Sequence, residues 1–237
     1  MSAANQKVAV ITGASQGIGA ALVDAYRKLG YRVVASSRTI AESRDPNVVT
    51  VRGDIADAAT AERIIATGLE RFGRIDTVVN NAGVFLAKPF ADYTPDDFTT
   101  ATGVNLAGFF HLTQQAVPHL LAQGGGHIVA VTTSLVDHAD SHVPSVLASL
   151  TKGGLQSAVK SLAIEYAGRG IRANAVSPGI INTPMHLPTQ LDALSGLIPV
   201  GRLGEPGDIA GAVIYLETAP YVTGAILHVD GGQSAGH

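Results

Sequence analysis

The sequence lacks cysteine altogether: none of its 237 residues carries a thiol. Disulfide bonds, thiolate nucleophiles and metal sites built on cysteine are therefore excluded. No metal site is expected from the remaining side chains either. Charged residues are few, at 15% of the chain, whereas 46% of the residues are hydrophobic. This balance fits a domain whose central sheet is buried on both faces.

Basic clusters and long apolar runs are missing as well. Lys and Arg number 16 against 19 Asp and Glu, which gives a net charge of −3 without a basic block. Nucleic acid is therefore not expected as the main partner. No signal-peptide pattern is present, and no apolar run reaches the roughly 18 residues that would span a membrane. We therefore expect a cytoplasmic protein that does not associate with membranes.

The hydrophobic pattern predicts one α/β domain that spans residues 1–237. Seven short runs rich in β-branched residues alternate with six helical segments, without an internal repeat or a linker. This alternation is typical of a doubly wound, seven-stranded parallel sheet flanked by helices. The predicted strands lie at about residues 8–12, 32–36, 48–52, 75–79, 127–132, 172–176 and 225–229.

The stretch from Val8 to Gly19 predicts a strand, a tight loop and the start of a helix. Gly13, Gly17 and Gly19 allow the backbone to turn sharply and to approach a ligand closely. The free N–H groups at the helix start and the positive end of the helix dipole favour an anion such as a pyrophosphate. A glycine-rich turn without any ligand is the alternative.

The residues after the second predicted strand bear on the choice of cofactor. An NAD site typically places a carboxylate there to bind the ribose hydroxyls. This sequence has Ser37 and Arg38 instead. A hydroxyl beside a guanidinium suits a 2′-phosphate, so NADP(H) is favoured over NAD(H). An arginine that is merely solvated in a loop is the alternative.

Two further polar positions stand out from the pattern. Asp54 follows the third predicted strand, where it can accept a hydrogen bond from an adenine amino group or cap the next helix. Asn105 lies between apolar residues within a helix predicted at 94–121. Because asparagine competes for backbone hydrogen bonds in a helix, it suggests either a kink or a functional role there.

Read together, the motifs of this chain resemble those of the short-chain dehydrogenase/reductase (SDR) family. The resemblance covers essentially the whole chain, in order and at the family's spacing. It implies a Rossmann-type domain, an NAD(P)-dependent oxidoreductase, a small-molecule substrate, and a homotetramer or homodimer. The motifs that carry it are Thr12–Gly19, Asn80–Gly83, Asn105, Lys152, Pro178-Gly179 with Thr183, and Asp230–Gly232.

The resemblance also implies which residues hold the cofactor. Lys152 is implied to hold the nicotinamide-ribose hydroxyls, and Asn105 to support a water chain that leads to this lysine. The implied cofactor-binding residues are Gly13, Ser15, Gly17, Ile18, Gly19, Ser37, Arg38, Asp54, Ile55, Asn81, Ala82, Gly83, Lys152, Pro178, Gly179, Ile181 and Thr183.

The family's chemistry further uses a tyrosine four residues before the lysine as proton donor. Residues i and i+4 are neighbours on a helix face, and the lysine charge lowers the pKa of the phenol. Ala148 occupies that position here. The family's substrate-polarising serine falls on Thr133 when counted from the preceding strand, and on Ser134 when counted back from Ala148. The candidate catalytic residues are therefore Lys152, Asn105, Ser134 and Thr133.

Three kinds of function are compatible with this pattern. The first is an NADP(H)-dependent reductase for a substrate that needs no phenol, such as a protonated imine. The second is a ketone reductase with another proton donor, for which histidine suits because its pKa lies near working pH. The third is a non-catalytic NADP-binding sensor or partner protein. The candidate donors for the second function are Asp137, His138, His142 and His186.

Overall fold

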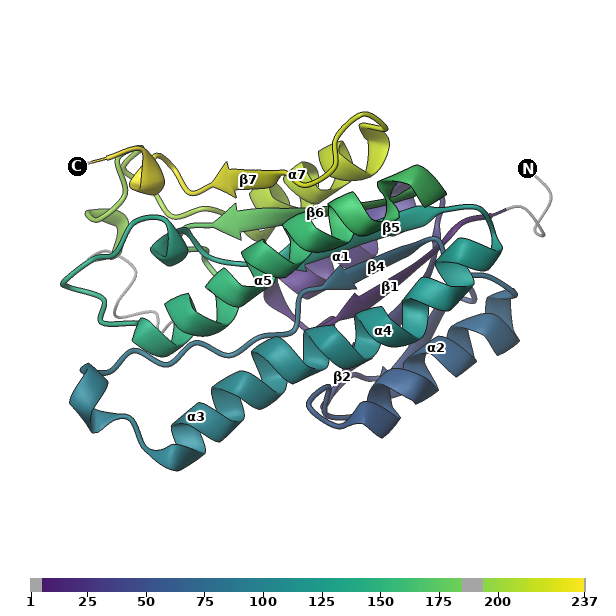
Figure 1. Cartoon of the computed structure of the whole chain (residues 1–237), viewed down its shortest axis with the longest axis horizontal. Coiled ribbons are helices and arrows are strands. Elements are labelled where there is room, and N and C mark those ends of the chain that lie inside the picture. The colour runs from purple at the N-terminus through teal and green to yellow at the C-terminus, as the bar shows by residue number, and fades with distance from the viewer. Residues whose placement is uncertain (1–5, 185–193, 237) are drawn as a thin grey trace.

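The seven predicted strands form one parallel sheet in the order β3-β2-β1-β4-β5-β6-β7. This computed structural model describes residues 6–184 and 194–236, which make a single Rossmann-like α/β domain (Figure 1). The predicted strands are confirmed, and their ends shift by no more than two residues. The strands are β1 (Val8–Thr12), β2 (Arg32–Ser37), β3 (Val48–Arg52), β4 (Thr77–Asn80), β5 (Gly126–Val131), β6 (Ile171–Pro178) and β7 (Ile226–Val229).

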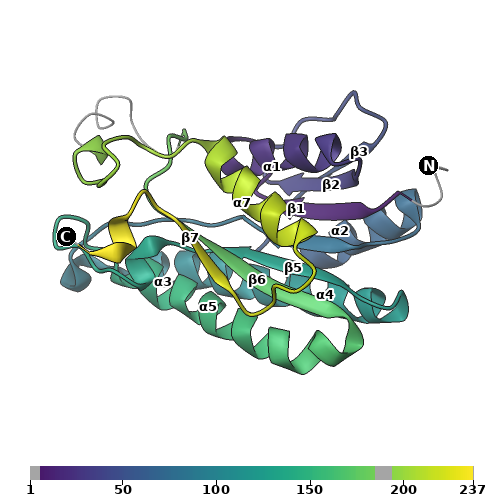
Figure 2. The same ribbon diagram turned by 90° about the horizontal axis from the view of Figure 1, so that it is seen from above.

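Helices cover both faces of the sheet. Figure 2 shows α1 (Gly17–Lys28) and α7 (Pro206–Thr218) on one face, and α2 (Ala58–Phe72), α4 (Gly108–Ala122) and α5 (Val146–Tyr166) on the other. All residues of β1 are buried. Because side chains alternate along a strand, Val8 and Val10 pack with the second group of helices, whereas Ala9 and Ile11 pack with the first.

The helix predicted at 94–121 is a succession of three segments, α3 (Pro95–Ala101), a π-helical segment (Thr102–Ala107) and α4. Thr94 caps α3, because its hydroxyl accepts a hydrogen bond from Asp97 N at 3.1 Å. Asn105 lies within the π-helical segment, where the α-helical hydrogen-bond pattern is interrupted. The short 3₁₀ segments are η2 (Phe90–Asp92), η4 (Ser134–Val136), η5 (Ala167–Arg169) and η7 (Gln233–Ala235).

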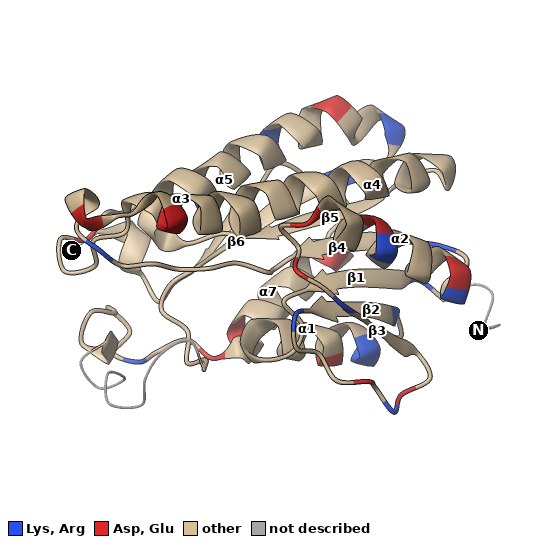
Figure 3. Ribbon diagram, turned by 90° about the horizontal axis from the view of Figure 1, so that it is seen from below, with Lys and Arg blue, Asp and Glu red and all other residues tan. Residues whose placement is uncertain are grey.

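Acidic and basic residues are interspersed over the ribbon rather than separated into regions of one sign (Figure 3). Helix α2 is an example, because Glu62 is followed by Arg63 and Glu70 by Arg71. Within residues 6–184 and 194–236, no helix combines the length and the apolar character that crossing a bilayer requires.

Glu217, near the end of α7, joins several elements at the amino ends of the strands. Its side chain is only 5% exposed. The carboxylate accepts hydrogen bonds from Tyr26 Oη (3.0 Å), Tyr31 Oη (2.8 Å), Thr77 Oγ1 (3.0 Å) and His127 Nδ1 (2.9 Å). Burial alone would raise the pKa of this carboxyl, but the donors outweigh burial and hold the pKa below its usual range. An ionised carboxylate therefore ties α1, β4 and β5 to α7.

The imidazole of His127 in this cluster is neutral. Asn174 Nδ2, which can only donate, lies 3.0 Å from His127 Nε2. Nε2 therefore accepts, and the proton resides on Nδ1 and points to Glu217. The orientation of Asn174 is itself fixed, because its side-chain oxygen accepts from Ala225 N at 3.1 Å. Burial lowers the pKa of His127, in agreement with a neutral ring.

Replacing Glu217 tests how much this buried acceptor stabilises the fold. Glu217→Leu leaves four buried donors without an acceptor, so the free energy of unfolding should fall by about 3–5 kcal/mol at pH 7. Because the folded-state pKa is depressed, the wild-type advantage is complete above the ordinary value of 4.5 and diminishes as the pH falls below it. Urea denaturation at several pH values measures both effects.

Glu217→Gln is the matched control for this measurement. The amide keeps one acceptor oxygen, and the Tyr31 hydroxyl can accept from its NH₂ group. Glu217→Gln should therefore lower the free energy of unfolding clearly less than Glu217→Leu does. Equal losses for the two variants would contradict the assigned role of the carboxylate oxygens.

Candidate functional site

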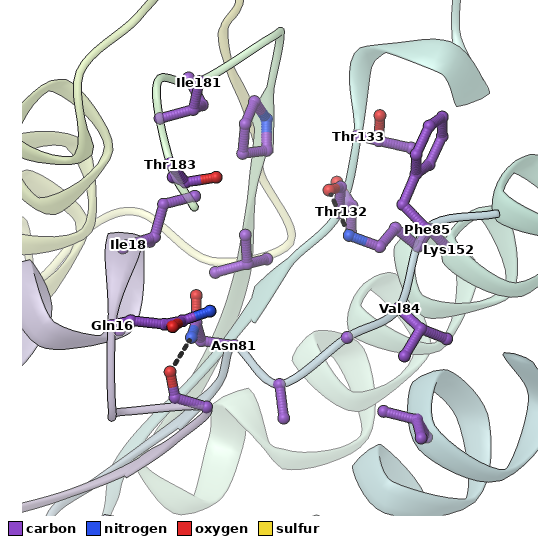
Figure 4. Close-up of a pocket in the computed structure, with 18 of the residues that line it drawn as sticks. Gln16, Ile18, Asn81, Val84, Phe85, Thr132, Thr133, Lys152, Ile181 and Thr183 are labelled. Atoms are coloured by element: carbon purple, nitrogen blue, oxygen red, sulfur yellow. Dashed lines mark hydrogen bonds between the residues drawn. The ribbon is translucent and has the colours of Figure 1, made fainter. Parts of the chain in front are cut away.

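A cavity of about 930 Å³ lies along the carboxyl ends of β1, β4, β5 and β6. The sheet order reverses between β1 and β4, which is where doubly wound sheets bind their ligands. Figure 4 shows the loop after β1, the ends of β4 and β5 and the segment after β6 facing one another. The volume lies within the range of roughly 300–1,000 Å³ that is typical of small-molecule sites.

The loop between β1 and α1 has the backbone that the glycine pattern predicted. Gly13 and Gly17 have positive φ angles of 66° and 54°. A Cβ at Gly19 would collide with the Gly13 carbonyl oxygen, and one at Gly17 would lie 3.1 Å from the Thr183 methyl carbon. Gln16, at the N-cap of α1, makes no side-chain hydrogen bond to the first turn. The N–H groups of that turn are thus left for a ligand in the cavity.

Side-chain hydrogen bonds join this loop to the end of β4. Thr12 Oγ1 accepts from Asn81 N at 3.1 Å and from Ala82 N at 3.0 Å. In return, Asn81 Nδ2 donates to the Thr12 carbonyl oxygen at 2.9 Å. This close approach requires glycine at position 13, because a Cβ there would lie 2.9 Å from Ala82 Cα. Asn81 therefore fixes the relative position of the two walls.

The end of β2 and the residues after β3 form the far part of the cavity. Ser37, Arg38 and Asp54 all line it. The N-cap of α2 is Asp57, whose carboxylate accepts from Ala59 N at 3.0 Å. The alternative that Asp54 caps this helix is therefore wrong. Asp54 remains a candidate for contact with a ligand.

Lys152 extends from α5 into the cavity. Its Nζ donates to the Thr132 carbonyl oxygen at 3.1 Å, the dashed line beside Lys152 in Figure 4. Desolvation lowers the pKa of Lys152 to about 8, and no carboxylate contributes to the shift. A Cβ at Gly83 would lie 3.6 Å from Lys152 Nζ and 3.3 Å from Asn105 Oδ1. The glycine thus allows these two side chains to approach the same point of the chain.

Asn105 is buried and does not itself line the cavity. Its Oδ1 accepts from Val84 N at 2.9 Å. Its Nδ2 donates to the Val84 carbonyl oxygen at 3.1 Å and to Thr151 Oγ1 at 3.0 Å. Asn105 therefore positions the segment after β4 against α5, next to Lys152. The water chain that the resemblance implied for this residue stays a prediction.

Both candidate hydroxyl groups after β5 line the cavity. Thr133 is the N-cap of η4 and its Oγ1 accepts from Leu135 N at 3.4 Å. Ser134 is more buried, at 3% exposure. Ala148 is 2% exposed and does not belong to the lining. The first turn of α5 therefore brings no hydroxyl group to this wall at residue 148.

The cavity brings together every residue implied around the cofactor. That they bind it stays a prediction. The residues are Gly13, Ser15, Gly17, Ile18, Gly19, Ser37, Arg38, Asp54, Ile55, Asn81, Ala82, Gly83, Lys152, Pro178, Gly179, Ile181 and Thr183.

The four candidate proton donors differ in whether they line the cavity. His142 lines the cavity, whereas Asp137 and His138 do not. His186 lies outside the described residues. Asp140 also lines the cavity and was not predicted, although its place two residues before a histidine is a recognisable signal.

Several other lining residues were not singled out one by one by the sequence analysis, and Phe85 and Gln233 are two of them. Phe85 lies two residues after the Asn80–Gly83 motif and carried no signal of its own. Gln233 follows the terminal Asp230–Gly232 motif, and its Oε1 accepts from Ile180 N at 3.2 Å. That contact folds the C-terminal segment back onto the cavity, over a distance in sequence that no local pattern reveals.

Comparison with known proteins relates this chain to oxidoreductases. The profile of a family described as enoyl-(acyl carrier protein) reductase matches residues 13–234. The chain is 37% identical over 251 residues to the 2-(R)-hydroxypropyl-CoM dehydrogenase of Xanthobacter autotrophicus, covering 97% of this chain and 99% of that one. The 3-ketoacyl-(acyl-carrier-protein) reductase from Brucella melitensis complexed with NADH superposes with a TM-score of 0.90, 31% identity, and coverage of 98% and 99%. The structure of ElxO with NADP bound gives a TM-score of 0.90, 28% identity, and coverage of 98% and 100%.

The lowered pKa of Lys152 has a measurable effect on stability. Between about 8 and the ordinary 10.5, the unfolded chain holds a proton that the folded protein lacks, so wild-type stability rises with pH in this window. Below pH 8 the cost of burying the ammonium is fully present. Lys152→Met removes this dependence. Its stability relative to wild type should therefore fall by up to about 3 kcal/mol as the pH rises through the window.

Urea denaturation of both proteins without cofactor measures this difference. Lys160→Met, at an exposed position further along α5, is the matched control for removing an amine from the same helix. A difference in free energy of unfolding between wild type and Lys152→Met that does not change with pH would contradict the desolvation of this amine.

Proposed function

Because the chain belongs to the SDR family, we propose that it is an NADP(H)-dependent oxidoreductase that interconverts a small ketone and its secondary alcohol. Two of the relatives named above are a dehydrogenase of a hydroxypropyl compound and a 3-ketoacyl reductase, names that indicate a hydroxyl group and a carbonyl group in the substrate. The observation that carries the proposal is that both parts of the site line the same cavity. It has an anion-binding loop at one end, and Lys152 with the hydroxyls of Thr133 and Ser134 at the other.

The residues of the cavity fit a nicotinamide dinucleotide. The positive φ angles of Gly13 and Gly17 and the uncapped first turn of α1 form a cradle that a Cβ at Gly19 would fill. This cradle suits the pyrophosphate. Lys152 Nζ has donor capacity beyond its bond to Thr132, which suits the ribose hydroxyls. When bound in reduced form, the cofactor supplies a hydride.

This chain's own residues would prepare the substrate for the hydride. The hydroxyl of Thr133 or Ser134 donates a hydrogen bond to the substrate oxygen and so polarises the carbonyl group. The side chains of Val84, Phe85 and Leu135 line the same cavity and would give the reacting carbon apolar surroundings. Lys152 adds positive charge near the oxygen as negative charge develops there.

We propose NADP(H) rather than NAD(H) on the lining at the end of β2. Ser37 and Arg38 both face the cavity there. The one carboxylate of this region that lines the cavity, Asp54, belongs to the segment after β3 rather than to β2. A guanidinium and a hydroxyl can bind a 2′-phosphate, whereas they offer no preferred acceptor to the 2′-hydroxyl.

A second candidate substrate is a cyclic imine. Ala148 carries only a methyl group and is buried, so α5 offers no phenol at that position. A protonated imine already carries its proton, so it becomes a neutral amine on receiving a hydride and needs no acid from the protein. A cofactor-binding sensor without turnover is the remaining alternative.

A paired substrate panel tests the proposed function. We expect the wild type to oxidise NADPH with small cyclic ketones, and to reduce NADP⁺ with the matching alcohols, measured by the absorbance of the reduced nicotinamide. Lys152→Ala should lose most of this activity. Turnover of matched imines but not of ketones would replace the first candidate by the second. Tight NADPH binding without any turnover would favour the sensor.

Arg38→Ala tests the cofactor preference. Losing a charge-assisted contact to the 2′-phosphate should weaken NADPH binding by about 10–100-fold, with little change for NADH. Fluorescence titration of the two cofactors measures the ratio. Arg44→Ala removes the same charge from an exposed loop position outside the cavity and should leave both affinities unchanged. Equal weakening of NADPH and NADH by Arg38→Ala would contradict the 2′-phosphate contact.

A further inference from the structure

The wall of the cavity next to Ala148 is built by the loop between β5 and α5. Ala148 is buried and does not line the cavity, so it brings no polar atom to the substrate. The loop lines the cavity instead, and it includes the only imidazole among the described lining residues. Its lining residues are Thr132, Thr133, Ser134, Leu135, Asp140, His142 and Val143.

His142 is held within this loop by Asp140. The Asp140 Oδ1 atom accepts from the backbone N of His142 at 2.8 Å and pairs with its Nδ1 at 2.9 Å. These bonds lower the pKa of Asp140, which is therefore ionised and requires a proton on Nδ1. The second ring nitrogen, Nε2, has no hydrogen-bond partner in the described part of the chain. The pair thus leaves one ring nitrogen without a partner on a residue that lines the cavity.

The loop is itself tied to its surroundings on both sides of this pair. Pro144, two residues after His142, accepts from Lys88 N at 3.0 Å through its carbonyl oxygen. The Ser149 hydroxyl on α5 donates to the Leu135 carbonyl oxygen at 2.9 Å. Val143 N donates to the Asp140 carbonyl oxygen at 3.1 Å and closes the turn around the histidine. The imidazole is therefore positioned by backbone contacts as well as by the carboxylate.

We infer that His142, oriented by Asp140, is the proton donor to the substrate oxygen in this protein. The inference rests on the proposed ketone reduction. As the carbonyl carbon accepts the hydride, the π bond opens and the oxygen takes the proton from Nε2. The imidazolium becomes neutral imidazole, and the cofactor is oxidised. In the reverse direction, Nε2 removes the hydroxyl proton. Asp140 is a positioning residue that also stabilises the imidazolium.

The exposure of His142 agrees with this role. Its side chain is 78% exposed, whereas that of Asp140 is 24% exposed. The outer edge of the ring can therefore exchange protons with solvent after each turnover. The other candidates of this region are less suited, because Asp137 is engaged by Gln156 Nε2 at 3.1 Å and by His228 Nε2 at 3.0 Å, outside the cavity. Histidine is also the side chain best matched to proton transfer near neutral pH.

His142→Ala is the decisive variant. Loss of a positioned acid should lower kcat for ketone reduction by about 10²–10⁴-fold. NADPH affinity, measured by fluorescence, and KM for the ketone should change little. Imidazole added to the buffer should restore part of the lost rate in the variant without accelerating the wild type. His138→Ala, in the same loop but outside the cavity lining, is the matched control and should keep the wild-type kcat.

Asp140 is tested by two variants and one spectroscopic signature. Asp140→Asn keeps an oxygen that can accept from Nδ1 but removes the charge, so kcat should fall while KM is retained. In the cofactor-free wild type, ring-nitrogen NMR of the neutral form should show His142 protonated on Nδ1. In Asp140→Ala the proton should move to Nε2. An unchanged tautomer in Asp140→Ala would overturn the positioning role.

The outcomes separate this inference from the proposed function. Ketone turnover that keeps its wild-type kcat in His142→Ala overturns the assignment of the proton donor and leaves the proposed function intact. A wild type that binds NADPH but reduces no ketone overturns both. Loss of kcat in His142→Ala, with rescue by imidazole and normal NADPH binding, supports both.

Discussion

The hydrogen bonds between the ends of β1 and β4 are the constraint on which the rest of the cavity depends. One hydroxyl, that of Thr12, receives two backbone N–H groups from the β4 end, and the Asn81 amide returns a bond to the β1 end. The glycine loop on one side and Gly83 on the other are thereby held in one frame. A buried hydroxyl or amide that lost these partners would cost about 1–3 kcal/mol. The frame is therefore rigid where the sheet order reverses.

The two ends of the sheet show opposite arrangements of polar groups. At the amino ends, Glu217 has four donors and His127 has a partner at both ring nitrogens. At the carboxyl ends, the Lys152 amine has a backbone carbonyl as partner but no carboxylate, and the first turn of α1 lacks a side-chain cap. One end is internally satisfied and stabilises the domain. The carboxyl end keeps hydrogen-bond donors that can still bind a ligand, as sites that bind and transform ligands commonly do.

Local sequence patterns were sufficient to predict the strands and the glycine loop. The β-branched runs and Gly13, Gly17 and Gly19 depend on backbone preferences that a short stretch of sequence expresses. The contacts of Asn105 could not be foreseen in this way, because Thr151 lies 46 residues away on another helix. The Asp140–His142 pair was partly visible, since the histidine was one of four candidates. Only the folded loop distinguishes it from His138, which also has aspartates nearby in sequence but does not line the cavity.

The central position of β1 also governs when the cavity can form during folding. β1 pairs with β2, its neighbour in sequence, but also with β4, and the contact between Thr12 and Asn81 spans 69 residues. Contacts of such separation require closure of a long loop, which makes them slow to form. The β1–β2 half can assemble early from local contacts. The frame that holds the glycine loop is completed only when β4 docks, so a chain with native-like helices would still lack this wall of the cavity.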